Sequence, residues 1–294
     1  MKKKLSLKEL VSRIAFCRCA ASAVFLVFVQ GSLQIACAQG FVMPDTYPSA
    51  SGNRAVAYSG EGMVTEATQS DPRNRARIHT ELGALYFRDG NVAVALEELR
   101  IALEIDSKYE HAYAMRGLIN FYTGERQEAE EDYRKALGIA ENDPEINNNY
   151  GTFLCQTGRV EESIGYFMRA AKNPSYRTPD LAYLNAGQCA AMAGDDKTAE
   201  EYLSRSARLA PRPSSITMVE QAGIRYRRGA YEEARRLLSN ARRSGSPDAK
   251  ALWLSVRVER KLGNYDSSQS YAAQLQRQFP DSSEVKNMRT GNYE

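Results

Sequence analysis

Small and apolar residues recur along the chain with a period of 34 to 36 residues. The period is marked by Gly90, Gly124, Gly158, Gly194, Gly229 and Gly263. Small or branched residues stand seven positions earlier at Gly83, Gly117, Gly151, Gly187, Ala222 and Val256, and small ones five positions later at Ala95, Ala129, Ser163, Ala199, Ala234 and Ser268. Small residues at such spacing allow two helices to cross closely, so each period predicts an antiparallel helix pair with a glycine turn.

Helix start signals recur in the same phase. Asp143-Pro144-Glu145 combines a capping aspartate, a proline at the first helical position and an acid near the positive helix end, and Asp71-Pro72, Thr178-Pro179 and Ser246-Pro247 repeat the device. This period is that of the tetratricopeptide repeat. We therefore predict an all-α, right-handed superhelical solenoid of six repeats, at residues 76–109, 110–143, 144–179, 180–214, 215–248 and 249–282, followed by a polar tail at 283–294.

The first 37 residues have the pattern of an export signal. Six Lys and Arg residues flank or precede the apolar run from Ala20 to Val29. Leu33 to Cys37 resembles a bacterial lipobox, although Gln34 stands where an aliphatic residue is usual, and predicts lipidation of Cys37. Ordinary cleavage after Ala38 and an uncleaved anchor are the alternatives. Ala38 favours the outer membrane over the inner membrane for a lipidated chain. Residues 38–75 are rich in Gly, Ser, Pro and Ala and predict a flexible linker.

Removal of the signal reverses the sign of the net charge. The whole chain carries +3, and residues 1–36 carry six Lys and Arg against one Glu, so the remainder carries about −2. The basic character belongs to the signal, and we exclude nucleic acid as a partner.

Catalytic and metal-binding patterns are missing from the sequence. It contains no phosphate-binding loop, no nucleophile elbow and no His-Glu-x-x-His motif. His79 and His111, the two histidines, fall on different first helices away from cysteine or acid clusters. We expect no enzymatic activity, no metal, no cofactor and no small-molecule substrate.

The first helices of repeats two to four contain apolar and amide residues that the repeat register places on the concave side. An apolar and amide groove suits an extended peptide or a helix of another protein. The candidate partner-binding residues are Leu118, Phe121, Tyr122, Asn147, Asn148, Asn149, Thr152, Leu184, Gln188 and Met192.

Asn147, Asn148 and Asn149 are not required by the repeat. They lie 100° apart around a helix, so at least one is expected to be buried and one exposed. Three asparagines cost about 2 kcal/mol in helix propensity relative to alanine. Side-chain hydrogen bonds that offset this cost would form either an amide ladder in the groove floor or direct contacts to a ligand.

Cys155 and Cys189 fall at similar heights on adjacent first helices. In an oxidising compartment the pair forms either a disulfide or two buried thiols. A bridge would close a loop of about 35 residues and stabilise the fold by roughly 3.5 to 4 kcal/mol.

The segment from Asn142 to Cys155, with Tyr166-Phe167, Pro174-Ser175-Tyr176 and the segment from Tyr183 to Cys189, closely resembles the type IV pilus biogenesis and stability family of tetratricopeptide lipoproteins, often called pilotins. The resemblance covers nearly the whole exported chain, and it is most specific in repeats two to four. It matches the asparagine segment and both cysteines residue by residue.

The resemblance implies a protein attached to the periplasmic face of the outer membrane through its lipid. It also implies that the protein binds the secretin subunit of the pilus and promotes localisation and multimerisation of that subunit. A soluble periplasmic protein is the alternative location. A general periplasmic adaptor for outer-membrane or cell-wall machinery is the alternative function.

Overall fold

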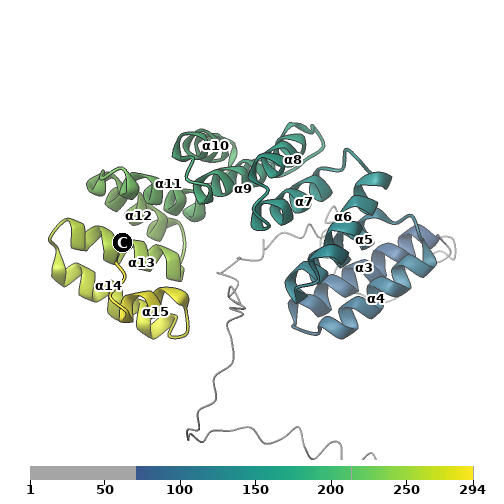
Figure 1. Cartoon of the computed structure of the whole chain (residues 1–294), viewed down its shortest axis with the longest axis horizontal. Coiled ribbons are helices and arrows are strands. Elements are labelled where there is room, and N and C mark those ends of the chain that lie inside the picture. The colour runs from purple at the N-terminus through teal and green to yellow at the C-terminus, as the bar shows by residue number, and fades with distance from the viewer. Residues whose placement is uncertain (1–70, 213, 294) are drawn as a thin grey trace, which may run out of the picture. The chain divides into compact units, whose positions relative to one another are not determined.

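A computed structural model describes residues 71–212 and 214–293, all within the unit Thr46–Glu294. These residues form thirteen α-helices and no strand (Figure 1). The helices are α3 (Pro72–Arg88), α4 (Val92–Ile105), α5 (Glu110–Thr123), α6 (Arg126–Ile139), α7 (Pro144–Gln156), α8 (Val160–Lys172), α9 (Pro179–Met192), α10 (Asp196–Leu209), α11 (Ser215–Arg227), α12 (Tyr231–Ser244), α13 (Ala249–Lys261), α14 (Tyr265–Gln278) and α15 (Ser283–Arg289).

The first twelve of these helices form six hairpins, from α3/α4 to α13/α14, and each first helix also contacts the first helix of the next hairpin. The six turn glycines all have φ between 76° and 96°, a left-handed conformation that favours glycine. Figure 1 shows the hairpins following one another in chain order. The predicted all-α solenoid of tetratricopeptide repeats is confirmed.

The helix crossings explain why the sequence repeats small residues. A Cβ atom on Gly187 would lie 2.7 Å from Cγ of Leu203, and one on Gly151 would lie 2.8 Å from the ring of Phe167. Leu203 and Phe167 are almost fully buried. The second helix of each of these two pairs therefore places a large side chain directly against a glycine of the first.

The array begins earlier than the predicted boundary. Helix α3 starts at Pro72, and the Asp71 carboxylate caps it by accepting a hydrogen bond from the Arg73 amide at 3.0 Å. Residues 72–75, which were predicted as linker, are therefore helical, because the cap at Asp71 starts α3 before the predicted first repeat at residue 76. At α13 the cap is Asp248, which accepts from the Ala251 amide at 2.7 Å, so the Ser246-Pro247 pair lies outside the helix.

The predicted polar tail also contains a helix. Ser282 caps α15, and Val285 and Met288 are buried against Leu252 and Trp253 of α13. These two apolar residues, three positions apart, give the short helix a single apolar face. Helix α15 therefore covers the end of the array that the sixth repeat would otherwise leave open.

The signal, Cys37 and most of the predicted linker lie outside the described residues. In the described part of the chain, every helix is too short or too polar to cross a membrane.

Candidate protein-binding surface

Asn147 is fully buried near the start of α7. Its side-chain amide donates hydrogen bonds to the main-chain oxygens of Glu141 at 2.8 Å and Asp143 at 2.7 Å. These bonds fasten the loop between α6 and α7 to the third repeat. Asn147 therefore does not line a groove, contrary to its inclusion among the partner-binding residues, because its donor groups face the preceding loop.

Asn148 faces the neighbouring repeat. Its side-chain oxygen accepts a hydrogen bond of 3.0 Å from the amide of Asn185 on α9, and its main-chain oxygen accepts one of 3.0 Å from Thr152. Asn148, Asn149 and Thr152 are all half-buried. The contact between two amides on adjacent first helices favours the ladder interpretation for Asn148.

A second set of polar contacts links the first helices α9, α11 and α13. Gln188 of α9 donates to Glu220 of α11 at 2.9 Å, and the ammonium group of Lys250 on α13 lies 2.5 Å from the same carboxylate oxygen. Glu220 is buried. A buried carboxylate needs such partners, so Gln188 is held in position before any ligand arrives.

The apolar candidates divide by exposure. Leu184 is buried and packs with Leu203 and Ile224, so it does not line a groove either, because α11 covers it. Leu118 and Phe121 are half-buried. Only Tyr122 and Met192 are exposed, and 72% of the Met192 surface is free. Of the ten candidates, Asn147 and Leu184 are thus buried, and the other eight are half-buried or exposed.

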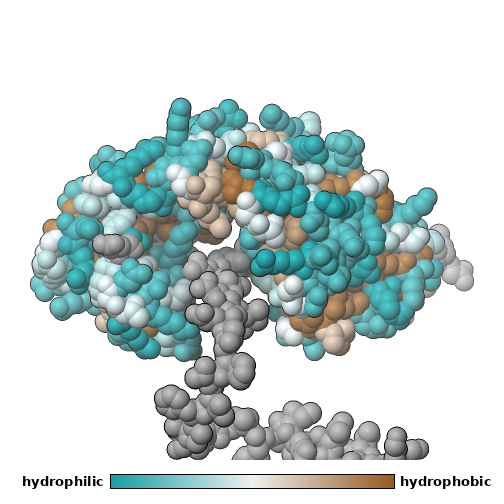
Figure 2. All heavy atoms as spheres, viewed as in Figure 1, coloured by the Kyte–Doolittle hydropathy of each residue, from teal (hydrophilic) through white to brown (hydrophobic). Residues whose placement is uncertain are grey.

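Another apolar surface lies at the N-terminal end of the array. We define the N-terminal apolar surface as the exposed residues Ile78, Leu85 and Tyr86 of α3, Val94 of α4 and Tyr122 of α5. The Tyr122 ring lies 5.6 Å from the Phe87 ring of α3, which joins the two first helices. Figure 2 shows hydrophobic residues gathered over this end.

This surface arises because each repeat of a solenoid buries apolar residues against both neighbours. Within the described residues, α3 and α4 have a following repeat but no preceding one. This surface was not predicted, although Ile78, Leu82 and Leu85 form an apolar stripe at helical spacing.

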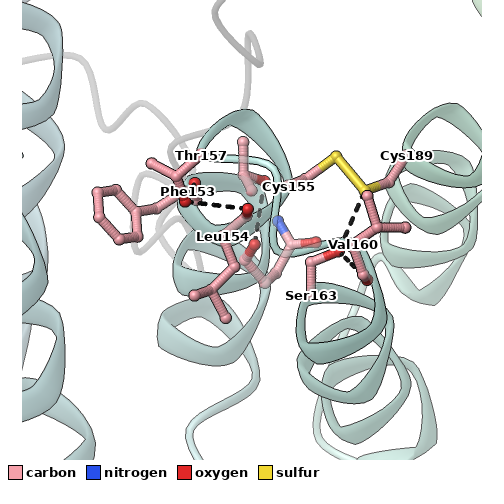
Figure 3. The surroundings of a disulfide bond; sticks show 9 residues. Phe153, Leu154, Cys155, Thr157, Val160, Ser163 and Cys189 are labelled. Carbon is pink, nitrogen blue, oxygen red and sulfur yellow. Dashed lines mark hydrogen bonds between the residues drawn. A yellow bond between two sulfur atoms is a disulfide. The ribbon is translucent and has the colours of Figure 1, made fainter. Parts of the chain in front are cut away.

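Cys155 of α7 and Cys189 of α9 are joined by a disulfide, with their Cα atoms 5.8 Å apart (Figure 3). The Ser163 hydroxyl lies 3.1 Å from the sulfur of Cys189. Both cysteines are buried. The bond fastens repeat three to repeat four near the C-terminal end of α7, whereas the three asparagines lie near the start of that helix.

Titratable groups near the asparagine segment form structural contacts. The pKa of Glu145, near the start of α7, is raised by burial and by the neighbouring Asp143 carboxylate. His111 lies 3.8 Å from the Asp143 carboxylate, and His79 is 2.7 Å from Glu98. The described residues contain no group of three or more side chains that could hold a metal ion.

Comparison with known proteins agrees with this architecture. Family models described as "Tetratricopeptide repeat" match residues 110–143 and 219–283. The type IV pilus assembly protein PilF of Pseudomonas aeruginosa is 30% identical over 231 residues, which cover 76% of this chain and 91% of that protein.

Two solved structures extend the comparison. PilW, described as a widely conserved type IV pilus biogenesis factor, is 34% identical and superimposes with a TM-score of 0.65 over 72% of this chain and 97% of PilW. The structure of P. aeruginosa PilF is 30% identical, with a TM-score of 0.64 over 75% of this chain and all of PilF.

The fold and its surfaces define a tetratricopeptide-repeat protein of the kind that binds other proteins. The similarity to PilF spans nearly all of that relative, with matching crystal structures of both PilF and PilW. The chain belongs to the PilF/PilW family of type IV pilus biogenesis proteins.

Proposed function

We propose that the protein is a non-catalytic scaffold for type IV pilus assembly, which binds the secretin subunit and promotes its localisation and multimerisation at the outer membrane. The observation that carries the proposal is the 30% identity to PilF over 91% of that protein. A role in type IV pilus biogenesis follows from the family. The secretin, the lipid on Cys37 and the location on the periplasmic face are the specific parts proposed here.

The N-terminal apolar surface supports a protein partner. Exposed apolar clusters on soluble proteins mark interaction sites more often than chance exposure does. Burial of one leucine or aromatic side chain stabilises a complex by about 1.5 to 3 kcal/mol. Leu85 and Tyr86 are 45% and 36% exposed, so burial of the remaining surface would contribute about 1 kcal/mol each.

The polar side-chain contacts between neighbouring first helices also support binding of a protein partner. Asn148, Gln188 and Glu220 are fixed by bonds between repeats, so the first helices keep their spacing without a ligand. A rigid array loses little conformational entropy on binding. Met192 and Tyr122, at the two sides of this region, are exposed to solvent.

Deletion of the gene tests the function. We expect the deletion strain to lose heat-resistant secretin multimers on an immunoblot and to lose surface pili, and we expect the wild-type gene to restore both. Normal multimers and normal pili in the deletion strain would refute the proposal. Loss of pili with normal multimers would indicate that the partner is another component of the pilus assembly system and not the secretin.

A matched pair of variants tests the surface. Leu85→Glu places a charge on the N-terminal apolar surface, where the side chain is 45% exposed, and Leu209→Glu places the same charge at a 50% exposed site on α10. Both variants should fold, because neither leucine is buried. We expect Leu85→Glu to reduce secretin multimers at least tenfold and Leu209→Glu to leave them unchanged. Equal effects of both variants would exclude the N-terminal apolar surface as the docking site.

Cys37 has its own test. Cys37→Ser should abolish labelling by an alkyne-tagged fatty acid and should shift the protein from the outer-membrane fraction to the soluble periplasmic fraction. Unchanged fractionation of Cys37→Ser would exclude a lipid anchor at this residue.

A further inference from the structure

The last residues of the chain fold back onto the array. Helix α15 ends at Arg289 and is followed by Gly291, whose φ of 74° is left-handed. The amides of Gly291 and Asn292 donate hydrogen bonds to the main-chain oxygens of Met288 and Asn287. The turn directs the chain away from the axis of α15 and toward the first helices of repeats five and six. Tyr293 packs there without belonging to any helix.

Four residues hold Tyr293, and we call them the Tyr293 site: Tyr226 of α11 and Trp253, Arg257 and Arg260 of α13. The Trp253 ring lies 5.2 Å from the Tyr293 ring, and the Arg260 guanidinium lies 4.0 Å from the same ring. The ring is thus held by an aromatic contact and a cation–π contact.

The main chain of Tyr293 is held as well. Its carbonyl oxygen accepts a hydrogen bond from Arg257 Nε at 3.2 Å and one from the Tyr226 hydroxyl at 3.4 Å. The Arg257 guanidinium lies 4.4 Å from the centre of the Tyr226 ring, so one contact positions both donors. Two donors on adjacent repeats therefore converge on a single peptide oxygen.

These contacts recognise features that many chains share. The ring contacts need an aromatic face, and the two donors need a main-chain carbonyl group beside it. An aromatic residue in any extended segment offers both, and such segments are common ligands of repeat arrays. The site is formed by first helices, the helices that carry the candidate groove in repeats two to four.

We propose that the Tyr293 site is a peptide-binding site for an extended segment of a partner protein that carries an aromatic residue. The chain's own C-terminus occupies this site and must leave before the partner segment binds. This inference does not depend on the secretin proposal, because the site lies in repeats five and six.

The structure makes the departure of Tyr293 feasible. Helix α15 is anchored by Val285 and Met288, which are buried in a cluster with Leu252, Val256 and Leu275. Tyr293 itself is half-buried and lies outside any helix, where local opening needs little free energy. When Tyr293 leaves, the parts of Trp253 and Tyr226 that it contacts become accessible to a partner.

The occupied site sets the size of the expected effect. A short tether holds its ligand at an effective concentration of about 1 mM. If a free peptide binds the empty site with a dissociation constant of about 100 μM, occupancy by Tyr293 weakens its apparent affinity about tenfold.

Trp253 is the single tryptophan of the chain, so its emission reports on the site. The test titrates an acetylated peptide with the sequence of residues 290–294 into the full-length wild type and into Tyr293→Ala. We expect a saturable shift of Trp253 emission with Tyr293→Ala at about 100 μM peptide, and no shift with the wild type below about 1 mM. Tyr293→Phe, which keeps the ring, should behave as the wild type.

Two controls identify the contacts. A peptide with alanine in place of its tyrosine should not bind Tyr293→Ala, and Arg257→Ala added to Tyr293→Ala should abolish binding of the original peptide. No emission change in Tyr293→Ala that keeps the wild-type circular dichroism spectrum would overturn the proposal, as would equal affinity of both peptides.

A measurement on the wild type covers the case in which Tyr293→Ala fails to fold. The same peptide with benzoylphenylalanine in place of tyrosine is irradiated with the wild-type protein, and the crosslinked residues are identified by mass spectrometry. Crosslinks within residues 253–260 are expected. Crosslinks confined to other helices, or none at millimolar peptide, would overturn the proposal.

Discussion

Asn147 and Asn148 are adjacent, but their side chains use different atoms of the amide group: the nitrogen of Asn147 donates, and the oxygen of Asn148 accepts. Asn147 donates two hydrogen bonds to main-chain oxygens, whereas Asn148 accepts one from Asn185 through its side-chain oxygen. Substitution by aspartate replaces the amide donor with an oxygen and keeps the acceptor. We therefore expect Asn147→Asp to destabilise the protein strongly and Asn148→Asp to have little effect.

The magnitude follows from the contacts of Asn147. An ionised aspartate at this fully buried site would face two carbonyl oxygens, so the side chain must take up a proton in the folded state. Protonation at pH 7 costs about 4 kcal/mol from a reference pKa of about 3.9. The protonated group donates only one hydrogen bond, and the lost second bond adds about 1 kcal/mol. Asn147→Asp should therefore cost about 5 kcal/mol at pH 7.

The deficit depends on pH with a definite sign. The folded-state pKa of the introduced aspartate lies above its unfolded value, so the folded variant binds more protons than the unfolded chain above about pH 4. Its stability relative to wild type then rises as the pH falls, by about 1.4 kcal/mol per pH unit. At pH 5 the deficit should be about 2 to 3 kcal/mol smaller than at pH 7.

Thermal and urea unfolding at pH 7 and pH 5, followed by circular dichroism with the disulfide intact, measure this deficit. A loss of about 5 kcal/mol corresponds to a fall of roughly 10 to 20 °C in the thermal midpoint for an array of this size. Asn148→Asp should stay within about 1 kcal/mol of wild type, because the Asn185 amide keeps an acceptor. Wild-type stability of Asn147→Asp, or a deficit that is equal at both pH values, would refute the assigned donor role.

Three further predictions follow from the packing. Gly187→Ala should lower the free energy of unfolding, measured by urea titration, by about 1 to 2 kcal/mol, because the new Cβ would meet the buried Leu203 at 2.7 Å. Gly165→Ala, whose new Cβ would meet nothing within 4 Å, should raise the free energy of unfolding by about 0.5 to 1 kcal/mol through the better helix propensity of alanine. Replacement of both Cys155 and Cys189 by serine should cost about 3.5 to 4 kcal/mol, since the bridge spans 34 residues. Alkylation of Cys155 and Cys189 in the unfolded, non-reduced protein, detected by mass spectrometry, would contradict the bridge. Burial raises the pKa of Tyr109 and of Tyr176 to about 12, above the ordinary value of 10.0, so the stability present below pH 10 should be lost as the pH rises toward 12. In thermal scans Tyr109→Phe should reduce this loss, whereas Tyr265→Phe, at an exposed site, should not.

The repeat architecture was predictable because it depends on local spacing. The turn glycines and the small crossing residues recur at one period, and each acts within its own hairpin. The boundaries at the two ends were less predictable. At those ends a capping residue such as Asp71, or an apolar pair such as Val285 and Met288, decides where the array begins and stops.

The binding surface was predicted only in part. Helical register predicted at least one buried and one exposed asparagine. Asn147 is buried, whereas Asn148 and Asn149 are both half-buried. Register did not show that α11 covers Leu184, since burial at this position depends on the packing angle between adjacent repeats. Tyr122 and Met192 are the predicted residues that stay exposed.

The sequence by itself determined the class of fold, the number and phase of the repeats and the family resemblance, because these depend on spacing along one chain. Only the tertiary structure decided which donors and acceptors of the asparagine segment are used, how Glu220 is paired, and that Tyr293 occupies a site on repeats five and six. Those contacts join residues up to 67 positions apart, and their formation depends on how successive hairpins pack.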